Sequence, residues 1–472
     1  MGTLVARVDD ADVWWVAAAG RQMLATGTVP RTNGFSFVEP DHPWVMHEWL
    51  FGPPYAWGLG SLGPRFFALV AAAAFALTGA LVAAGTVGRA RHLAVGCAAA
   101  LIAAVLFAHP TARPTWVTLL FPAAMALLAF RVTLGRVAAC ACVALEVVWA
   151  NAHGSFPLGI VLLGAAAWAA PLDRRRRLTA TLAAAAVTLV NPYGPRLHAL
   201  VLDYVFAARD HGMGDLSAIV EYAPLWDPRY FAVHSIAAML ALGGLLLVAV
   251  GALRDAAHRP RAVLVLALVP LAVLHARFVP TLAIVAAIVL VPALDDAVAR
   301  TRLAAYAGGP WCPSRRTVGV YAGGVAAIAA TAFATVASRP ADAWIDPALG
   351  GASFLRLVSR LPDGANVLTP FRSAGLVLWR DAPRGVRVFY DSRNDPYSPE
   401  MRRVGLTLLD RPPAEIVDQL QRHGTTYALV PSPQGVQATP RRGYDGALDA
   451  APDWSPWARD GDWCVYARRP PP

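Results

Sequence analysis

Long apolar segments separated by arginine-rich loops limit what this chain can fold into. About 20 consecutive apolar residues cross a bilayer as a helix. Hydrophobic residues make up 56% of the chain and charged residues 15%, a ratio that excludes a soluble globule. The pattern predicts an α-helical polytopic membrane protein with about ten spans. The candidate spans, poor in charge, lie at 66–87, 93–108, 114–130, 137–150, 154–172, 178–190, 231–253, 262–274, 278–294 and 317–337.

The basic residues, all 41 of them arginines, predict the topology. A net charge of +10 would suit nucleic acid, but the arginines cluster between apolar segments, so no nucleic-acid partner is expected. Short cytoplasmic loops retain positive charge. One set of alternate loops carries 15 arginines, including RRRR at 174–177, and the other set carries 5. The arginine-rich set is therefore predicted to be cytoplasmic, which leaves residues 1–63 and everything after the last span outside.

Residues 1–63 are expected to need an anchor that this sequence lacks. Their export calls for a preceding transmembrane helix, so we expect a first span to be missing, through a start codon assigned too late or a truncated sequence. The alternative is that the span at 66–87 acts as a reverse anchor.

After about residue 340 the composition becomes charged and rich in proline and turns. Segments 352–360 and 413–423 have the spacing of amphipathic helices. Short β-rich runs lie at 366–369, 386–390, 427–430 and 463–467. The predicted organisation is an outer juxtamembrane loop at 1–63, a transmembrane helical bundle at 64–338 and a small outer α/β domain at 340–472.

The first part of the chain carries an acidic motif. Asp10 and Asp12, in an extended or turn segment, can point at one site, as a general base or as ligands for a divalent cation. A divalent cation is the only cofactor under consideration. The alternative for Asp9 and Asp10 is to cap the helix predicted at 13–26. That helix is expected to lie flat on the outer leaflet, with interfacial tryptophans at positions 14, 15, 44, 49 and 57.

His47 and Glu48 form a second polar pair, in the sequence HEW. A carboxylate beside Trp49 at the membrane surface is partly desolvated, which suits proton transfer. The alternative is that Glu48 is a structural partner of an arginine. We therefore include Glu48 among the candidate catalytic residues and His47 among the candidate substrate-binding residues.

Five outer loops present His, Arg, Asn or Glu beside the membrane, at 109–114, 149–156, 191–198, 219–226 and 275–278. Such a set suits a phosphate-bearing, lipid-linked substrate, because guanidinium groups bind phosphate bidentately. For each residue alone, snorkelling or helix capping is the simpler explanation. The candidate substrate-binding residues of these loops are Arg113, Asn151, His153 and Arg277.

Glu146 lies inside the predicted span 137–150, about one turn from its outer end. An acid in this position is expected to be functional or paired with Arg113 or Arg277. The polar sequence FYDSRNDPY at 389–397 follows a predicted strand, where it could bind substrate or close the module as a turn.

Four motifs together are similar to those of a known superfamily. They are DxDxWW at 10–15, GxxxLxxGxVPRTNGFS at 20–36, WVMHEWL at 44–50 and WANAHGSF at 149–156. The chain resembles bacterial polytopic membrane proteins of the glycosyltransferase C superfamily, related to protein mannosyltransferases, aminoarabinose transferases and oligosaccharyltransferases. The resemblance implies a transferase of the bacterial plasma membrane that uses a polyprenyl-phosphate sugar donor. It also implies that an acid of the first outer loop, Asp10 or Asp12, is the catalytic base.

Two other classes fit some of these features. A lipid or solute transporter would also have many spans, but it would place charges deep in the bundle and show related halves. A non-enzymatic membrane scaffold would not need the acidic first loop. Neither the sugar nor the acceptor follows from the sequence.

Overall fold

The computed structural model describes residues 8–86, 96, 116–131, 133–206, 224–227, 236–309, 314, 334, 338, 341–432 and 444–469. It divides the chain into two compact units. The helical unit comprises Met1–Val5, Leu69–Pro195 and Leu216–Val336. The mixed unit comprises Ala6–Ala68, Arg196–Asp215 and Ala337–Pro472, so the two ends of the described chain fold together. The division of the chain into three parts at 1–63, 64–338 and 340–472 stays a prediction.

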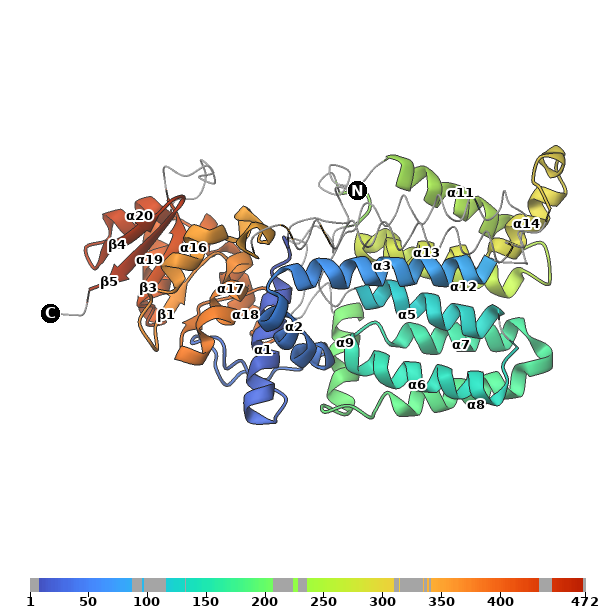
Figure 1. Cartoon of the computed structure of the whole chain (residues 1–472), viewed down its shortest axis with the longest axis horizontal. Helices are drawn as coiled ribbons and strands as arrows, with labels where there is room; N and C mark the ends of the chain where they lie inside the picture. The colour runs from blue at the N-terminus through green and yellow to red at the C-terminus, as the bar shows by residue number, and fades with distance from the viewer. Residues whose placement is uncertain are drawn as a thin grey trace. The chain divides into compact units, whose positions relative to one another are not determined.

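The helical unit is built from apolar helices packed side by side (Figure 1). Helix α13 is buried at every one of its positions and packs against α5 and α12, so it forms the centre of the unit. The helices are α3 (Arg65–Thr86, which begins in the mixed unit), α5 (Val117–Ala126), α6 (Arg136–Ala152), α7 (Pro157–Ala169), α8 (Arg174–Val187), α11 (Ile236–Ala252), α12 (Arg259–Leu274), α13 (Val279–Val289) and α14 (Val291–Ala299).

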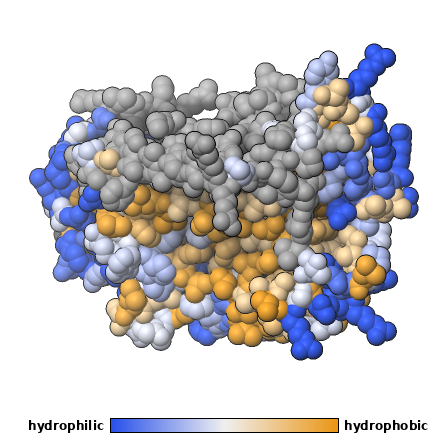
Figure 2. Space-filling model, turned by 45° about the vertical axis from the view of Figure 1, so that its right-hand side comes forward, coloured by the Kyte–Doolittle hydropathy of each residue, from blue (hydrophilic) through white to orange (hydrophobic). Residues whose placement is uncertain are grey.

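Large apolar side chains also face outward from this unit, among them Leu77, Leu182 and Leu247, which are 54%, 73% and 76% exposed. Figure 2 shows hydrophobic residues gathered over a broad area of the visible face, with hydrophilic residues at its borders. Apolar surface of this extent is rare on monomeric soluble proteins and is typical of proteins in contact with lipid.

Within the described residues, one helix is long and apolar enough to cross a membrane, at Arg65–Gly85. A second candidate is the pair Ala276–Val289 and Val291–Ala299, which is bent by 56°. The predicted spans at 93–108 and 317–337 lie almost entirely outside the described residues. The fold is thus mostly helical with one small sheet, and the count of ten spans stays a prediction.

The mixed unit contains a five-stranded sheet in the order β2-β1-β3-β5-β4 (Figure 1). Strand β1 pairs in parallel with β2 and β3, whereas β5 is antiparallel to both of its neighbours. The strands are β1 (Asn366–Leu368), β2 (Arg387–Val388), β3 (Tyr427–Pro431), β4 (Trp454–Asp460) and β5 (Trp463–Arg468). The helices of the C-terminal part are α16 (Gly351–Val358), α17 (Phe371–Asp381), α18 (Pro399–Thr407), α19 (Pro413–Arg422) and α20 (Tyr444–Ala450).

The sequence-based expectations for this module are largely confirmed. Helices form at the segments predicted around 352–360 and 413–423, and a strand forms in each of the four predicted β-rich runs. Strand β4 and helices α17, α18 and α20 were not predicted. Strand β4 contains Pro456 and keeps mostly half-buried or exposed side chains, so it lacks the apolar signal of a core strand.

Helix α1 (Asp12–Thr26) forms where a helix was predicted, but it does not expose its tryptophans as interfacial anchors. Trp14, Trp15 and Trp44 are 1%, 5% and 2% exposed. The ring of Trp14 packs edge-on against Phe67, and that of Trp15 against Trp44. The expectation of a helix lying flat on the outer leaflet is therefore wrong for this face of α1, because these rings fill the interior of the mixed unit.

Two helices enclose α1. Helix α2 (Gly52–Leu62) meets it so closely at Gly20 and Gly52 that a Cβ atom on Gly20 would overlap the Gly52 carbonyl. On α17, a Cβ atom at Gly375 would lie 2.7 Å from the carbonyl oxygen of Ala11. Glycine at these positions thus allows the helix backbones to approach each other. Arg21 also donates a hydrogen bond to the carbonyl of Trp379.

The loop after α1 joins the sheet at its β2 edge. Ser36 forms a parallel bridge with Val388, whose amide donates to the carbonyl of Phe35 at 3.0 Å. The Ser36 hydroxyl donates to the carbonyl of Phe389 at 3.1 Å. The acidic N-terminal segment is therefore fixed to the C-terminal sheet by backbone bonds.

Candidate functional site

The first acidic pair lies at the beginning of α1. The carboxylate of Asp10 accepts the backbone N–H of Asp12 at 2.9 Å, and the carboxylate of Asp12 accepts the indole N–H of Trp15 at 3.1 Å. Both aspartates are half-buried, while Asp9 is exposed. Asp10 thus forms a local turn bond before the helix, whose N-cap position is Ala11 and has no side-chain cap bond. Asp12 has a side chain oriented by a buried tryptophan, so its carboxylate is held in one direction.

His47 and Glu48 form a second site, together with a residue from the C-terminal part. His47 Nε2 lies 3.6 Å from Glu48 Oε1, and His47 Nδ1 lies 3.8 Å from Asp395 Oδ2. The phenol of Tyr204, on α9 (Pro195–Phe206), donates to Asp395 Oδ1 at 2.7 Å. The ring of Tyr204 stands edge-on to the imidazole. We call these four residues the His47 cluster.

The His47 cluster fixes the charge of its histidine. Burial opposes a charge on the ring, but the carboxylates of Asp395 and Glu48 outweigh it and raise the pKa of His47 to about 10. At neutral pH the ring is therefore an imidazolium between two carboxylates. An imidazolium donates hydrogen bonds and accepts no proton, so His47 is unsuited to act as a base.

A buried ion pair supports this arrangement. The guanidinium of Arg393 binds both oxygens of Asp391, at 2.8 and 2.7 Å, and donates to the side chain of Asn33 at 2.6 Å. It also stacks on Trp44, 4.6 Å from the ring centroid. The phenol of Tyr397 donates to Asp391 at 2.8 Å. The segment FYDSRNDPY is thus neither a simple turn nor a free binding loop, because it fastens the N-terminal segment to the sheet.

Two predicted binding residues of the helical unit are engaged within the turn between α6 and α7. Asn151 donates from Nδ2 to the carbonyls of Val147 and Val190, both at 2.8 Å. The Nδ1 atom of His153 lies 3.0 Å from the hydroxyl of Ser155. These bonds order the turn, so the role of both residues in substrate binding stays a prediction. Arg277 is half-buried in a short 3-10 helix (Ala276–Phe278), and Arg113 lies outside the described residues.

Glu146 is fully buried in α6, where its carboxylate lies over Gly159 of α7. Neither of its oxygens has a hydrogen-bond partner among the described residues. The predicted pairing with Arg277 is therefore not found, and the pairing with Arg113 lies outside what the structure describes.

Within the described residues no third ligand atom joins Asp10 and Asp12, so their role as ligands of a divalent cation stays a prediction. Within the described residues, one group has ligand atoms close enough to hold a metal ion: Asp255, His258 and Asp296 in the helical unit. There His258 Nε2 lies 2.7 Å from Asp296 Oδ2, and Arg300 lies 3.3 Å from Asp255. These contacts also suffice as an ion-pair network that joins the turn before α12 to α14.

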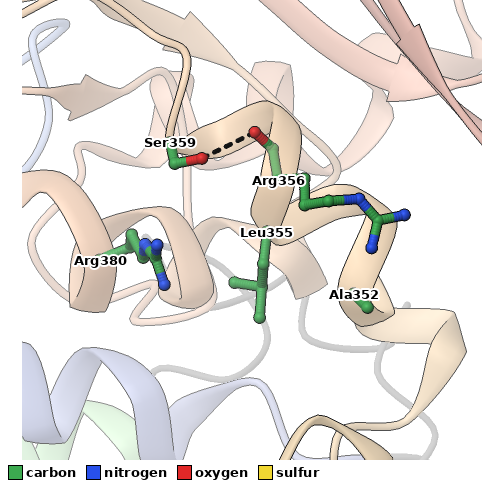
Figure 3. Close-up of a pocket in the computed structure, with 5 residues that line it drawn as sticks. All are labelled: Ala352, Leu355, Arg356, Ser359 and Arg380. Carbon is green, nitrogen blue, oxygen red and sulfur yellow. Dashed lines mark hydrogen bonds between the residues drawn. The ribbon is translucent and has the colours of Figure 1, made fainter.

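A shallow pocket of about 260 Å³ lies between α16 and α17 (Figure 3). Of its two arginines, Arg356 and Arg380, the first is held by Asp460 at 2.6 Å, and the hydroxyl of Ser359 donates to the Arg356 carbonyl at 2.8 Å. None of the predicted site residues lines it. The pocket therefore adds nothing to the candidate site.

The fold is similar to that of solved membrane transferases. AglB, the oligosaccharyltransferase of Archaeoglobus fulgidus in complex with an inhibitory peptide and a dolichol-phosphate, matches with a TM-score of 0.52 at 12% identity over 90% of this chain. The chain spans 66% of the length of that protein, and the apo form gives the same TM-score and coverage. ArnT from Cupriavidus metallidurans, bound to undecaprenyl phosphate, matches with a TM-score of 0.49 at 17% identity, covering 98% of this chain and 95% of that one.

No family model and no curated protein matches the sequence. The likeness to AglB is one of fold, and it agrees with the fold that the resemblance of the four short motifs implies.

Two residues of the His47 cluster were missed from the sequence. Asp395 stands in FYDSRNDPY, which was noted for its polarity, but nothing in its spacing indicated His47 as its partner. Tyr204 gave no signal at all, because a tyrosine in an apolar helix is common. Only the chain's long-range folding brings positions 47, 204 and 395 together.

Proposed function

We propose that this chain is a membrane glycosyltransferase that moves a sugar from a polyprenyl-phosphate donor to an acceptor on the outer face of a bacterial plasma membrane. The observation that supports it most is the fold, shared over 90% of the chain with an oligosaccharyltransferase whose structure holds dolichol-phosphate. A lipid-linked donor needs a protein embedded in the bilayer, and the exposed apolar surface of the helical unit suits that position.

In the proposed reaction a hydroxyl of the acceptor attacks the anomeric carbon of the sugar. The new carbon–oxygen bond forms as the bond from that carbon to the phosphate oxygen breaks, and polyprenyl phosphate leaves with the electron pair. Asp12 takes the proton of the hydroxyl. Its orientation by Trp15 supports this assignment over Asp10, whose carboxylate accepts a local backbone bond before the helix.

The other predicted residues have supporting roles. Arg113 and Arg277 stabilise the charge of the leaving phosphate, because guanidinium groups bind phosphate in a bidentate manner. Glu48, held beside the imidazolium of His47, is the second candidate base and a hydrogen-bond acceptor for sugar hydroxyls. Asn151 and His153 are expected to contact the donor from the turn that they order. The ten-span topology, with the C-terminal domain outside, is part of this proposal.

The test uses the protein in nanodiscs, with a radiolabelled decaprenyl-phosphate hexose. Release of decaprenyl phosphate and transfer to a cell-envelope extract are measured together. Asp12→Asn is expected to lower turnover by about 10²–10⁴-fold, the usual cost of losing a general base. The asparagine oxygen can still accept the indole N–H of Trp15, so thermal stability should be kept.

Asp9→Asn is the matched control, because it removes the same charge from an exposed neighbour. Arg277→Ala should raise KM for the donor more than it lowers kcat. Wild-type turnover in Asp12→Asn and Asp10→Asn alike would remove the acidic motif from the mechanism. If the wild type binds the donor without releasing decaprenyl phosphate, a transporter or scaffold becomes the better explanation.

A further inference from the structure

The His47 cluster joins three segments that are far apart in the sequence. His47 and Glu48 belong to the N-terminal segment, Tyr204 stands near the end of α9, and Asp395 lies in the loop after β2. Glu48 is 5% exposed, and the side chain of Asp395 is 7% exposed. Two carboxylates so close together in a buried site repel each other unless a cation separates them.

We propose that Asp395, held by Tyr204, is a positioning residue that keeps His47 as an imidazolium facing Glu48. The C-terminal domain thereby sets the charge of the acidic N-terminal segment. The inference rests on the function proposed above only where it is tested by enzyme activity. The titration of His47, which also tests it, does not depend on any activity.

The geometry carries the inference in two steps. The two ring nitrogens of His47 face different carboxylates, Nε2 toward Glu48 and Nδ1 toward Asp395. Both nitrogens can present a proton to a carboxylate only when the ring is an imidazolium. The phenol of Tyr204 occupies the other oxygen of Asp395 at 2.7 Å, so it leaves Oδ2 directed at the ring.

The consequence for Glu48 is electrostatic. The imidazolium lies 3.6 Å from the Glu48 carboxylate and holds it in place by charge attraction. Loss of Asp395 would allow the ring to release its proton near neutral pH and to lose its fixed orientation. Glu48 would then face a neutral ring, and its carboxylate would lose the charge attraction that holds it in place.

The first measurement is a titration of His47 itself. Full-length protein labelled in its histidine rings is followed by NMR from pH 5.5 to 10, and the His47 signal is identified by its loss in His47→Gln. In the wild type the ring should stay protonated up to about pH 9, in keeping with a pKa of about 10. In Asp395→Asn the pKa should fall by about 1–3 units, the usual effect of removing an opposite charge at this distance.

Tyr204→Phe should lower the pKa of His47 by less, because Asp395 keeps its charge but loses the bond that fixes it. The matched control is Tyr466→Phe, which removes a phenol that donates to Asp449 at 2.9 Å within the same domain. It should leave the His47 titration unchanged. An unchanged titration in Asp395→Asn overturns the inference, and should that variant fail to fold, an unchanged titration in Tyr204→Phe overturns it.

The second measurement is the pH profile of decaprenyl phosphate release. The charged fraction of the ring falls about tenfold per pH unit above its pKa. Turnover of Asp395→Asn should therefore decline with rising pH through the lowered pKa, while wild type and Asp395→Glu hold their turnover there. If turnover of Asp395→Asn changes with pH in the same way as that of the wild type, Asp395 is not a positioning residue. The pKa of His47 could be lower in Asp395→Asn than in the wild type while the wild type transfers no sugar. That result would support the inference and contradict the proposed function.

Discussion

The two units of the chain hold a buried acid in different ways. In the helical unit, Glu146 is fully buried in an apolar helix, and neither oxygen has a hydrogen-bond partner among the described residues. In the mixed unit, Asp391 is equally buried, but Arg393 binds both of its oxygens and Tyr397 donates to one of them. Burial alone therefore does not indicate what an acid does, since its partners decide the cost of its charge.

The partners also differ in where they come from. Glu146 lies against Gly159, thirteen positions along the chain, in the next helix. The ion pair of Asp391 reaches Asn33 and Trp44 in the N-terminal segment. This network connects the C-terminal sheet to the N-terminal segment that carries the acidic motif. The comparison can be tested by removing partners one at a time.

The largest effect is expected for Arg393→Met. It leaves the Asp391 carboxylate buried without its cation, which typically costs about 3–5 kcal/mol. The measurement is denaturant unfolding of the protein in detergent, followed by tryptophan fluorescence, because Trp44 stacks on this guanidinium.

The control is Arg356→Met, which breaks an arginine–aspartate pair of similar length whose arginine side chain is 59% exposed. Exposed pairs contribute about 0–1 kcal/mol. Equal losses of unfolding free energy in Arg393→Met and Arg356→Met would contradict the claim that buried partners decide the cost of a buried charge.

A smaller effect is expected for Gly20→Ala, on the contact between α1 and α2. The new methyl group would overlap the backbone of Gly52, and relieving such overpacking costs about 1–3 kcal/mol. Gly60→Ala on α2 is the matched control, because no atom lies within 4 Å of a Cβ there. Thermal unfolding should show a loss only in the first variant. A loss in both would mean that glycine serves backbone flexibility at these positions rather than close packing.

The sequence predicts features that depend on neighbouring residues better than features that depend on contacts between residues far apart in the chain. Local signals succeeded: the start of α1 near Asp12, the helix around 413–423 and the β-rich runs at 366–369 and 427–430 all form as expected. Three of the five tryptophans, Trp14, Trp15 and Trp44, were misassigned, because a buried ring and an interfacial ring have the same local sequence. Trp14 is recognised as buried only once Phe67 is known to lie beside it.

The candidate site shows the same limit. His47 and Glu48 adjoin in the sequence and were predicted together, and the distance between them bears out their proximity. Asp395 could not be assigned to them, because 348 positions separate it from His47 and no spacing rule covers such a distance. For Arg277 and Glu146 the sequence suggested a pair on the basis of depth alone, and depth does not fix which sides of two helices face each other.

The smallest effect is expected for Glu146→Gln. The amide fills the same space over Gly159 and removes an ionisable group with which no described residue pairs. The free energy of unfolding should therefore change by less than about 1 kcal/mol, whereas Asp391→Asn, the same change of charge at a paired site, should lose about 3–5 kcal/mol. Both are measured by the same denaturant titration. A large loss in Glu146→Gln would mean that the carboxylate has a cationic partner, with Arg113 the first to test by a double-mutant cycle. If Glu146→Gln keeps its stability but loses turnover, Glu146 takes part in the reaction. Burying an acid in an apolar helix costs free energy, and an acid that does not stabilise the fold is then explained by its function.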